Sequence, residues 1–266
     1  MGKVTIQSLT SEKPISIIGM EAGICWGGNV EDEHKNFQRG LDCLLSGHMR
    51  TAEYPQVYMV LDGYSARVIR EFYTHIGGSP TRLQASTRYI DYKNFKCVVP
   101  PKILKNPTAI TLYSGIIENT KNALQMMDEL DIPREDSANI LPLGMNTKIV
   151  VRTNLRHLLD MAQQRLCTRA YWEFKILMQD IIEALSAYSD EWEILIRKYK
   201  IFKAKCAVCG YCTEKNSCKL YPTKEQNDEY IKLGKMLKTK DYTHLVEYLT
   251  EDDKQILIQF LTLEKK

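Results

Sequence analysis

The chain has 266 residues, of which 44% are hydrophobic, and its 36 Lys and Arg residues against 33 Asp and Glu residues give a formal net charge of +3. Because the positive and negative charges are nearly balanced, the chain is not expected to bind nucleic acid through bulk electrostatics. No apolar run approaches the roughly 20 residues that a membrane helix requires, and the opening MGKVTIQSLTSEKP lacks the apolar core of a signal peptide. We therefore expect a cytoplasmic protein with a sizeable core.

Short β-branched runs open the chain. Val4–Leu9 and Ile15–Ile18, separated by the turn-like SEKP, predict two strands near the edge of a sheet. A helix that ends near Gly47 follows, and its buried face is predicted by Phe37, Leu41, Leu44 and Leu45. Gln56–Leu61 then alternates apolar and polar positions, which predicts a half-buried strand.

The next segment is a predicted helix that begins after Ser65, a suitable N-cap, and stops at the glycine pair Gly77 and Gly78. Its buried face consists of Val68, Ile69, Phe72, Tyr73 and Ile76. Beyond Pro80 we predict a loop that is dense in hydrogen-bonding groups, namely Ser79, Thr81, Arg82, Gln84, Ser86, Thr87, Arg88 and Tyr89. This composition suits an anionic ligand such as a nucleotide, and it also suits a solvated surface loop.

The second half of the chain is mainly helical. Thr108–Leu130 predicts a long helix, and Asn146–Arg152 predicts a strand. Thr153 and Asn154 then open a helix whose buried stripe is Leu155, Leu158, Leu159, Ala162 and Leu166. Ala170–Tyr199 reads as one long amphipathic helix. Two closing helices are predicted at Asp228–Leu237 and Tyr242–Leu261.

Two segments resemble the flavin-dependent thymidylate synthase (ThyX) family. The stretch from His75 to Tyr89 resembles the family's RHRxxSxNExSxRY if two residues are inserted between Ser79 and Gln84. The string LP…TNLRHLLDMAQQR…AYWEF resembles LP…xNxRxLxxFxxxR…AQWEI without a gap. The resemblance implies an α+β fold over residues 1–200, with a central antiparallel or mixed sheet packed with long helices, and residues 201–266 would form a C-terminal extension.

The resemblance also implies roles for individual residues. Binding of dUMP would involve Glu71, Gln84, Ser86, Arg88 and Arg165, with Arg165 and Ser86 as the catalytic residues. Binding of FAD would involve His48, Thr51, His75, Ser79, Asn154 and Arg156. The alternative is that Arg156 and Arg165 are ordinary helix-surface residues without a role in binding.

Several positions depart from the family pattern. Thr74, Ile76 and Ala138 stand where the family has arginines, and Gln84 replaces its glutamate. Asp160 stands in place of a common asparagine. We expect Arg82, in the enlarged loop, to compensate in part for the lost positive charge.

A cysteine cluster follows the family-like region. Cys206, Cys209, Cys212 and Cys218 form a C-x2-C-x2-C-x5-C array, and thiolates at such spacing fit tetrahedral zinc or an iron–sulfur cluster. Reduced thiols in a turn are the alternative. In a chain without secretion signals, thiols or metal are favoured over disulfides.

The function implied by the resemblance is conversion of dUMP to dTMP. Methylenetetrahydrofolate would be the one-carbon donor, NADPH the reductant and FAD the cofactor, in a homotetramer with its sites between subunits. One alternative is a flavin-dependent hydroxymethylase of pyrimidine nucleotides on the same fold. Another is a non-catalytic module that binds metal or nucleotide through the cysteine cluster.

Overall fold

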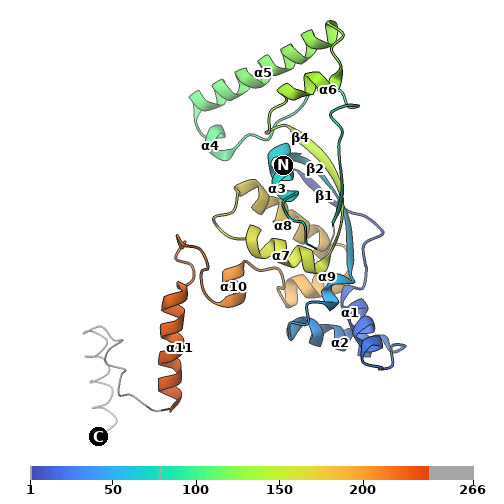
Figure 1. Cartoon of the computed structure of the whole chain (residues 1–266), viewed down its shortest axis with the longest axis vertical. Coiled ribbons are helices and arrows are strands. Elements are labelled where there is room, and N and C mark those ends of the chain that lie inside the picture. Colours follow the sequence, from blue (N-terminus) through green and yellow to red (C-terminus); the bar gives the residue numbers. More distant parts are fainter. Residues whose placement is uncertain (1, 78–79, 240–266) are drawn as a thin grey trace, which may run out of the picture. The chain divides into compact units, whose positions relative to one another are not determined.

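The computed structural model describes residues 2–77 and 80–239, and it divides the chain into two compact units, residues 1–204 and 205–266 (Figure 1). The strands are β1 (Lys3–Ile6), β2 (Gln56–Ser65), β3 (Thr81–Gln84) and β4 (Asn146–Asn154). The longer helices of the first unit are α1 (Pro14–Cys25), α2 (Glu33–Leu45), α3 (Ala66–Phe72), α5 (Pro107–Glu129), α7 (Leu155–Arg165) and α8 (Trp172–Ser186). Its short helices are η1 (Thr51–Glu53), α4 (Pro101–Leu104), α6 (Arg134–Ser137), η2 (Ala138–Ile140), α9 (Asp190–Glu193) and the π-helical η3 (Ile194–Lys198).

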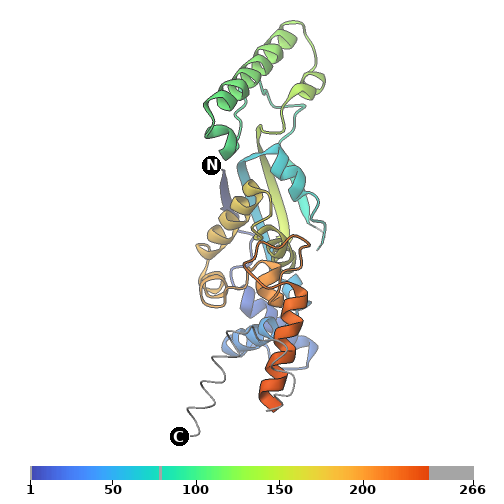
Figure 2. The ribbon, with the colours of Figure 1, turned by 90° about the vertical axis from the view of Figure 1, so that its left-hand side faces the viewer.

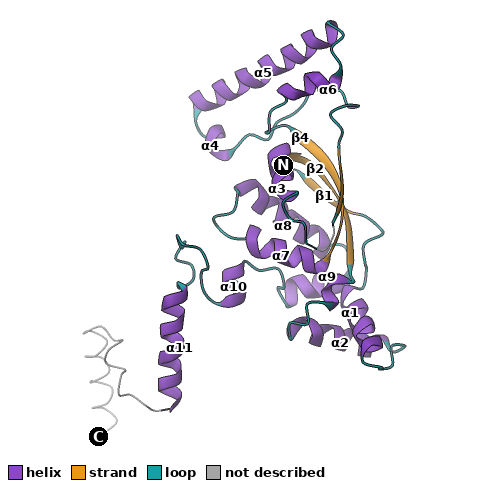
Figure 3. Cartoon of the chain, viewed as in Figure 1, coloured by secondary structure: helices purple, strands orange, loops and turns teal. Residues whose placement is uncertain are grey.

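An antiparallel sheet in the order β1-β2-β4-β3 forms the centre of the first unit. Along β2, Val57, Met59 and Leu61 are fully buried and alternate with half-buried residues, as expected for a strand with one face in the core. Figure 3 shows α3, α7 and α8 on one side of this sheet. The predicted strands at Gln56–Leu61 and Asn146–Arg152 are confirmed, although β2 continues to Ser65.

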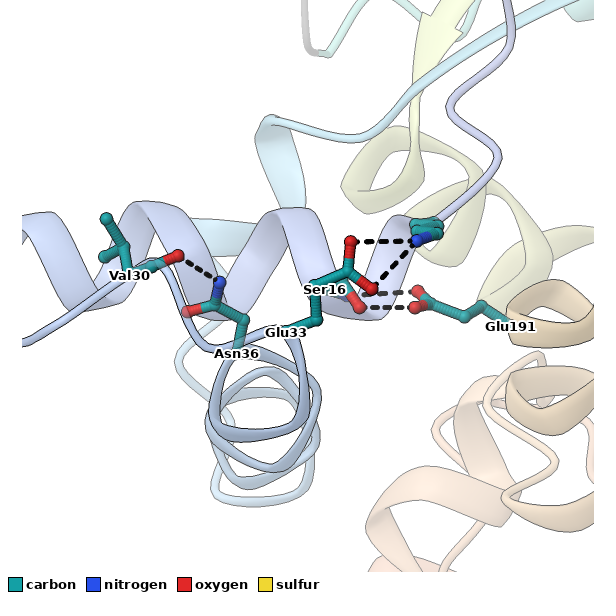
Figure 4. Close-up of polar contacts among 6 residues, drawn as sticks. Ser16, Val30, Glu33, Asn36 and Glu191 are labelled. Carbon is teal, nitrogen blue, oxygen red and sulfur yellow. Dashed lines mark hydrogen bonds and ion pairs between the residues drawn. The ribbon is translucent and has the colours of Figure 1, made fainter.

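The predicted strand Ile15–Ile18 is wrong, because these residues belong to α1. Pro14 occupies the first helical turn, where a missing N–H costs nothing, and Ile15 and Ile18 lie three residues apart on the buried face. The N–H groups of Ile15 and Ser16 donate to Oε2 of Glu191 at 2.7 and 3.0 Å, so a carboxylate from α9 caps the helix. Figure 4 shows the carboxylate of Glu191 against Ser16. A short apolar run alone does not distinguish a strand from a buried helix.

Helices α1 and α2 pack so closely that no side chain fits between them. A Cβ added at Gly19 would lie 1.7 Å from the carbonyl oxygen of Asn36, and one added at Gly40 would lie 1.9 Å from that of Ile15. Nearby, Asn36 donates from Nδ2 to the carbonyl of Val30 at 2.7 Å (Figure 4). The predicted end of α2 near Gly47 is confirmed, and Gly47 has a φ of 84°.

Further predictions are corrected by the structure. The helix predicted to run to the glycine pair ends at Phe72, and Ile76, predicted on its buried face, is exposed. The segment after Pro80 is not entirely a loop, because Thr81–Gln84 forms β3, which pairs with Ile149–Arg152 of β4. Ala170–Tyr199 is not one helix, because Ser189 adopts an extended conformation and its hydroxyl accepts from the N–H of Trp192 to start α9. The periodic pattern continues across this break, so hydrophobicity gives no signal of it.

Helix α5 confirms the predicted helix at Thr108–Leu130 but is poorly covered. Leu124 is its only buried residue, and it packs with Phe95 and Met145 in a small second core. Large apolar side chains remain exposed along it at Leu112, Ile116 and Met126. Figure 2 shows α4, α5 and α6 together beyond one end of the sheet, with α1 and α2 at the other end.

The second unit contains α10 (Lys205–Cys209) and α11 (Lys224–Thr239). Helix α11 confirms the predicted helix at Asp228–Leu237, whereas Tyr242–Leu261 lies outside the described residues. Within the described part of the chain, no helix combines the length and apolar character needed to cross a membrane.

Candidate functional site

Arg165, the last residue of α7, lies in a cluster of side chains from three helices and a connecting segment. Its Nε donates to Nε2 of His75 at 2.8 Å, and its Nη1 lies 3.2 Å from Oε2 of Glu71 on α3. The guanidinium carbon also sits 4.4 Å from the ring centroid of Phe174 on α8. Glu71, His75 and Arg165, all predicted as site residues, are therefore brought together.

The environment of His75 favours the neutral imidazole. Its side chain is buried, with the ring of Phe174 at 5.6 Å and the ring of His157 at 6.3 Å, both edge-on. Burial, together with the positive charge of Arg165, lowers the pKa of His75 to about 4. The pKa of His157 is lowered as well, mainly by burial and then by Arg82.

The position of this cluster depends on a second carboxylate, Glu173, which is 3% exposed. Glu173 accepts from the backbone N–H of Ser65 at 2.7 Å and from its hydroxyl at 2.5 Å. The Ser65 hydroxyl in turn accepts from the N–H of Val68 and so caps α3. Glu173 therefore fixes the start of α3 against α8, next to Phe174.

The residues predicted to hold the nucleotide phosphate form a separate group at and after β3. Gln84 donates to the hydroxyl of Thr147 at 3.3 Å, and the Ser86 hydroxyl accepts from the backbone N–H of Arg88 at 3.1 Å. Arg88 pairs with Glu135 of α6 at 2.7 Å in an exposed ion pair. Thr81 lies opposite Arg152 and Gln84 opposite Ile149, so β3 leads away from the start of α7 toward Ser86 and Arg88.

Four of the residues predicted to bind FAD lie near η1 or at the start of α7, whereas His75 belongs to the cluster at Arg165. The Thr51 hydroxyl donates to the carbonyl of exposed His48 at 2.7 Å, and Arg156 pairs with Glu53 at 2.6 Å. Asn154 is buried and its side chain accepts from the N–H of His157, which makes it the N-cap of α7. Ser79 lies outside the described residues.

This donor set fits an anionic cofactor. Arg156 offers a guanidinium that is 42% exposed, and an imidazole and a hydroxyl are carried by the neighbouring turn. Asn154 fits such a role less directly, since its side-chain oxygen already satisfies a backbone donor.

Arg82 is engaged by the protein itself. It donates to the carbonyls of Tyr73 and His75, and its guanidinium carbon lies 5.4 Å from the ring centroid of Phe72. Burial lowers its pKa. These contacts stabilise the chain after α3, so its expected compensation for the lost arginines stays a prediction.

Sequence reasoning missed His157 and Glu173. His157 is 4% exposed and its Nε2 has no hydrogen-bonding partner among the described residues. In the sequence His157 is a polar residue beside the apolar stripe of α7. Polar residues are common on the flanks of a helix, so this position alone does not indicate a site residue. Glu173 belongs to the matched string, but nothing in the sequence indicated its partner, Ser65.

The cysteine array lies in the second unit. Gly210 has a φ of 84° and donates its N–H to the carbonyl of Cys206 at 2.9 Å, which forms a tight turn after Cys209. All eight cysteines lie in the described ranges, and none forms a disulfide. In those same ranges no three His, Cys, Asp or Glu side chains form a group that could hold a metal ion, so the four-thiolate site stays a prediction.

Comparison with known proteins gives consistent results. The family profile described as "Thymidylate synthase complementing protein" (Thy1) matches residues 8–188. The chain is 29% identical over 192 residues to the flavin-dependent thymidylate synthase of Nitratidesulfovibrio vulgaris, which covers 68% of this chain and 75% of that relative. It is 27% identical over 227 residues to the flavin-dependent thymidylate synthase of Pyrococcus furiosus, and the match covers 81% of this chain and 91% of that relative.

Two solved structures share the fold. Thymidylate synthase X from Helicobacter pylori with FAD and dUMP aligns with a TM-score of 0.56 and 16% identity, over 71% of this chain and 95% of that chain. A second structure of that enzyme, also complexed with FAD and dUMP, aligns with a TM-score of 0.58 and 17% identity, over 72% of this chain and 98% of that chain. The α+β fold predicted from the sequence is thereby confirmed.

Proposed function

Because the chain belongs to the Thy1 family of thymidylate synthase complementing proteins, we propose that it is a flavin-dependent thymidylate synthase that converts dUMP to dTMP. The observation that carries the proposal is the Thy1 match, within which Arg165, His75 and Glu71 converge although 90 residues separate Arg165 from His75. Methylenetetrahydrofolate would provide the one-carbon unit and NADPH the reducing equivalent. FAD, when bound, supplies the hydride-transfer chemistry.

In this proposal the chain's own residues bind and orient the reactants. Arg165 contacts the pyrimidine and stabilises negative charge that develops on it during the reaction. Ser86 and Arg88, with Gln84, hold the sugar and phosphate, because a guanidinium and a hydroxyl are suited to phosphate oxygens. His48, Thr51, His75, Ser79, Asn154 and Arg156 are proposed to hold FAD.

We also propose that the active assembly is a homotetramer with its sites between subunits. One feature supports it. Helix α5 exposes Leu112, Ile116 and Met126, an apolar face of the kind that subunit contacts bury.

The test is to incubate purified protein with FAD, NADPH, methylenetetrahydrofolate and dUMP, and to identify the nucleotide product by mass. We expect dTMP, with loss of product when any component is omitted. Arg165→Lys should reduce turnover at least tenfold, whereas the matched control Arg197→Lys, in an exposed ion pair with Glu183, should not. A hydroxymethylated product without net NADPH consumption would instead identify a hydroxymethylase.

The cysteine array is proposed as an accessory metal site in the segment 201–266. Elemental analysis of anaerobically purified protein separates zinc, iron and no metal. The proposal requires about one zinc or several irons per chain that are lost in a Cys206→Ser, Cys209→Ser double variant.

A further inference from the structure

The contacts of Arg165 restrict its guanidinium on three sides. Nε is bonded to His75, Nη1 is paired with Glu71, and one face of the plane lies over Phe174. A guanidinium is planar and rigid, so two in-plane contacts together with a stacking contact define both its position and its tilt. Nη2 is the nitrogen that neither polar contact uses.

The ion pair within this arrangement is less exposed than comparable pairs of the chain. The side chains of Arg165 and Glu71 are 20% and 30% exposed, against 63% and 53% for Arg88 and Glu135. Exposed pairs hold their geometry weakly because water competes for both partners. The pair at Arg165 is therefore better suited to hold one orientation.

The bond to His75 also fixes a tautomer. Nε2 can accept from the Nε–H of Arg165 only through a lone pair, so the imidazole must be neutral and carry its proton on Nδ1. The edge-on rings of Phe174 and His157 limit rotation of the imidazole. His75 thus presents a fixed acceptor to Arg165.

We propose that Glu71 and His75 are positioning residues for Arg165, which hold its guanidinium so that Nη2 meets the pyrimidine ring of the substrate. The inference rests on the proposed function for the identity of the ligand. It gives Glu71 a role through Arg165 rather than through direct contact with the nucleotide. In this arrangement Nε2 of His75 accepts the hydrogen bond from Arg165, so only the Nδ1–H of His75 is left to contact a flavin.

The kinetic test compares variants that remove an acceptor with variants that keep one. Glu71→Ala and His75→Leu should lower kcat about 10-fold to 100-fold with a smaller change in KM for dUMP, because a misaligned group loses transition-state contacts more than ground-state binding. Glu71→Gln and His75→Gln retain an acceptor oxygen and should recover to within about fivefold of wild type. Glu183→Gln, which breaks an exposed Glu–Arg pair, is the matched control and should not change kcat.

A second measurement needs neither ligand nor turnover. The ¹⁵N spectrum of protein labelled at its five histidines, with His75→Gln for assignment, should show His75 neutral with its proton on Nδ1 at pH 6. A protonated ring, or a proton on Nε2, would overturn the inference even in a variant set that folds poorly. Equal loss in the Gln and Ala or Leu variants, or no loss in either, would overturn it too. If wild-type protein makes no dTMP, the proposed function fails, and the tautomer still decides the arrangement at Arg165.

Discussion

The neutral state of His75 predicts a specific loss of stability at mildly acidic pH. In the folded protein its pKa is about 4, whereas the unfolded chain has the ordinary value near 6.5. Between these values the unfolded state binds the proton and the folded state does not, so the stability that His75 contributes falls as the pH falls through this window. Above pH 6.5 the contribution is constant.

The magnitude follows from the two pKa values. Lowering the pH from 7 to 5 should cost about 2 kcal/mol of unfolding free energy through His75, and about 3 kcal/mol by pH 4. His157 contributes in the same direction, and carboxylates titrate in the lower part of the range. A comparison with His75→Gln cancels these other groups, because they remain in both proteins.

The assay is urea unfolding of the wild type and His75→Gln at pH 7, 6 and 5, followed by circular dichroism. We expect the wild type to lose about 2 kcal/mol more than the variant between pH 7 and 5. Parallel pH dependence of the two proteins would refute the assignment of a neutral, buried His75.

Other predictions concern the elements that position the cluster, and each can be measured by urea unfolding. Gly40→Ala should destabilise the protein by about 3 kcal/mol, because the new Cβ would meet the carbonyl of Ile15 at 1.9 Å and force α1 from α2; a loss below 1 kcal/mol would contradict this packing. Glu173→Ala should cost about 2–3 kcal/mol, since it removes the acceptor of two Ser65 donors, and Glu173→Gln should recover part of the loss. Ser189→Ala should cost about 1 kcal/mol through loss of the α9 cap, with no change in dUMP affinity.

Much of the fold could be predicted because local signals agreed with the tertiary structure. In α7, the cap Asn154 precedes an apolar stripe of helical period, and in β2 the alternation matches one buried face. The strand predicted at Ile15–Ile18 was wrong because four apolar or small residues fit either period. The break at Ser189 was missed because its cause is a hydroxyl that bonds to a backbone N–H, which hydrophobic patterns do not report.

The candidate site was predictable only in part. Glu71, His75 and Arg165 could be named from the family resemblance, but the bond between Nε and Nε2 joins residues far apart in the chain. Such a contact depends on how α3, α7 and α8 pack, and periodicity gives the buried face of each helix without its neighbours. The same limit explains why His157 and the pairing of Glu173 with Ser65 were not found.

The short strand β3 has a consequence for evolution of the segment that precedes it. Side chains alternate between the two faces of a sheet, and the pairing of Arg82 with Val151 turns the arginine toward the helices. Loss or gain of a single amino acid upstream of Thr81 would shift the register of β3 by one residue. Leu83 would then face the helices and Arg82 would face away from them, so the carbonyl of His75 would lose its donor. Length changes in this part of the gene should therefore be tolerated in pairs of codons more readily than singly.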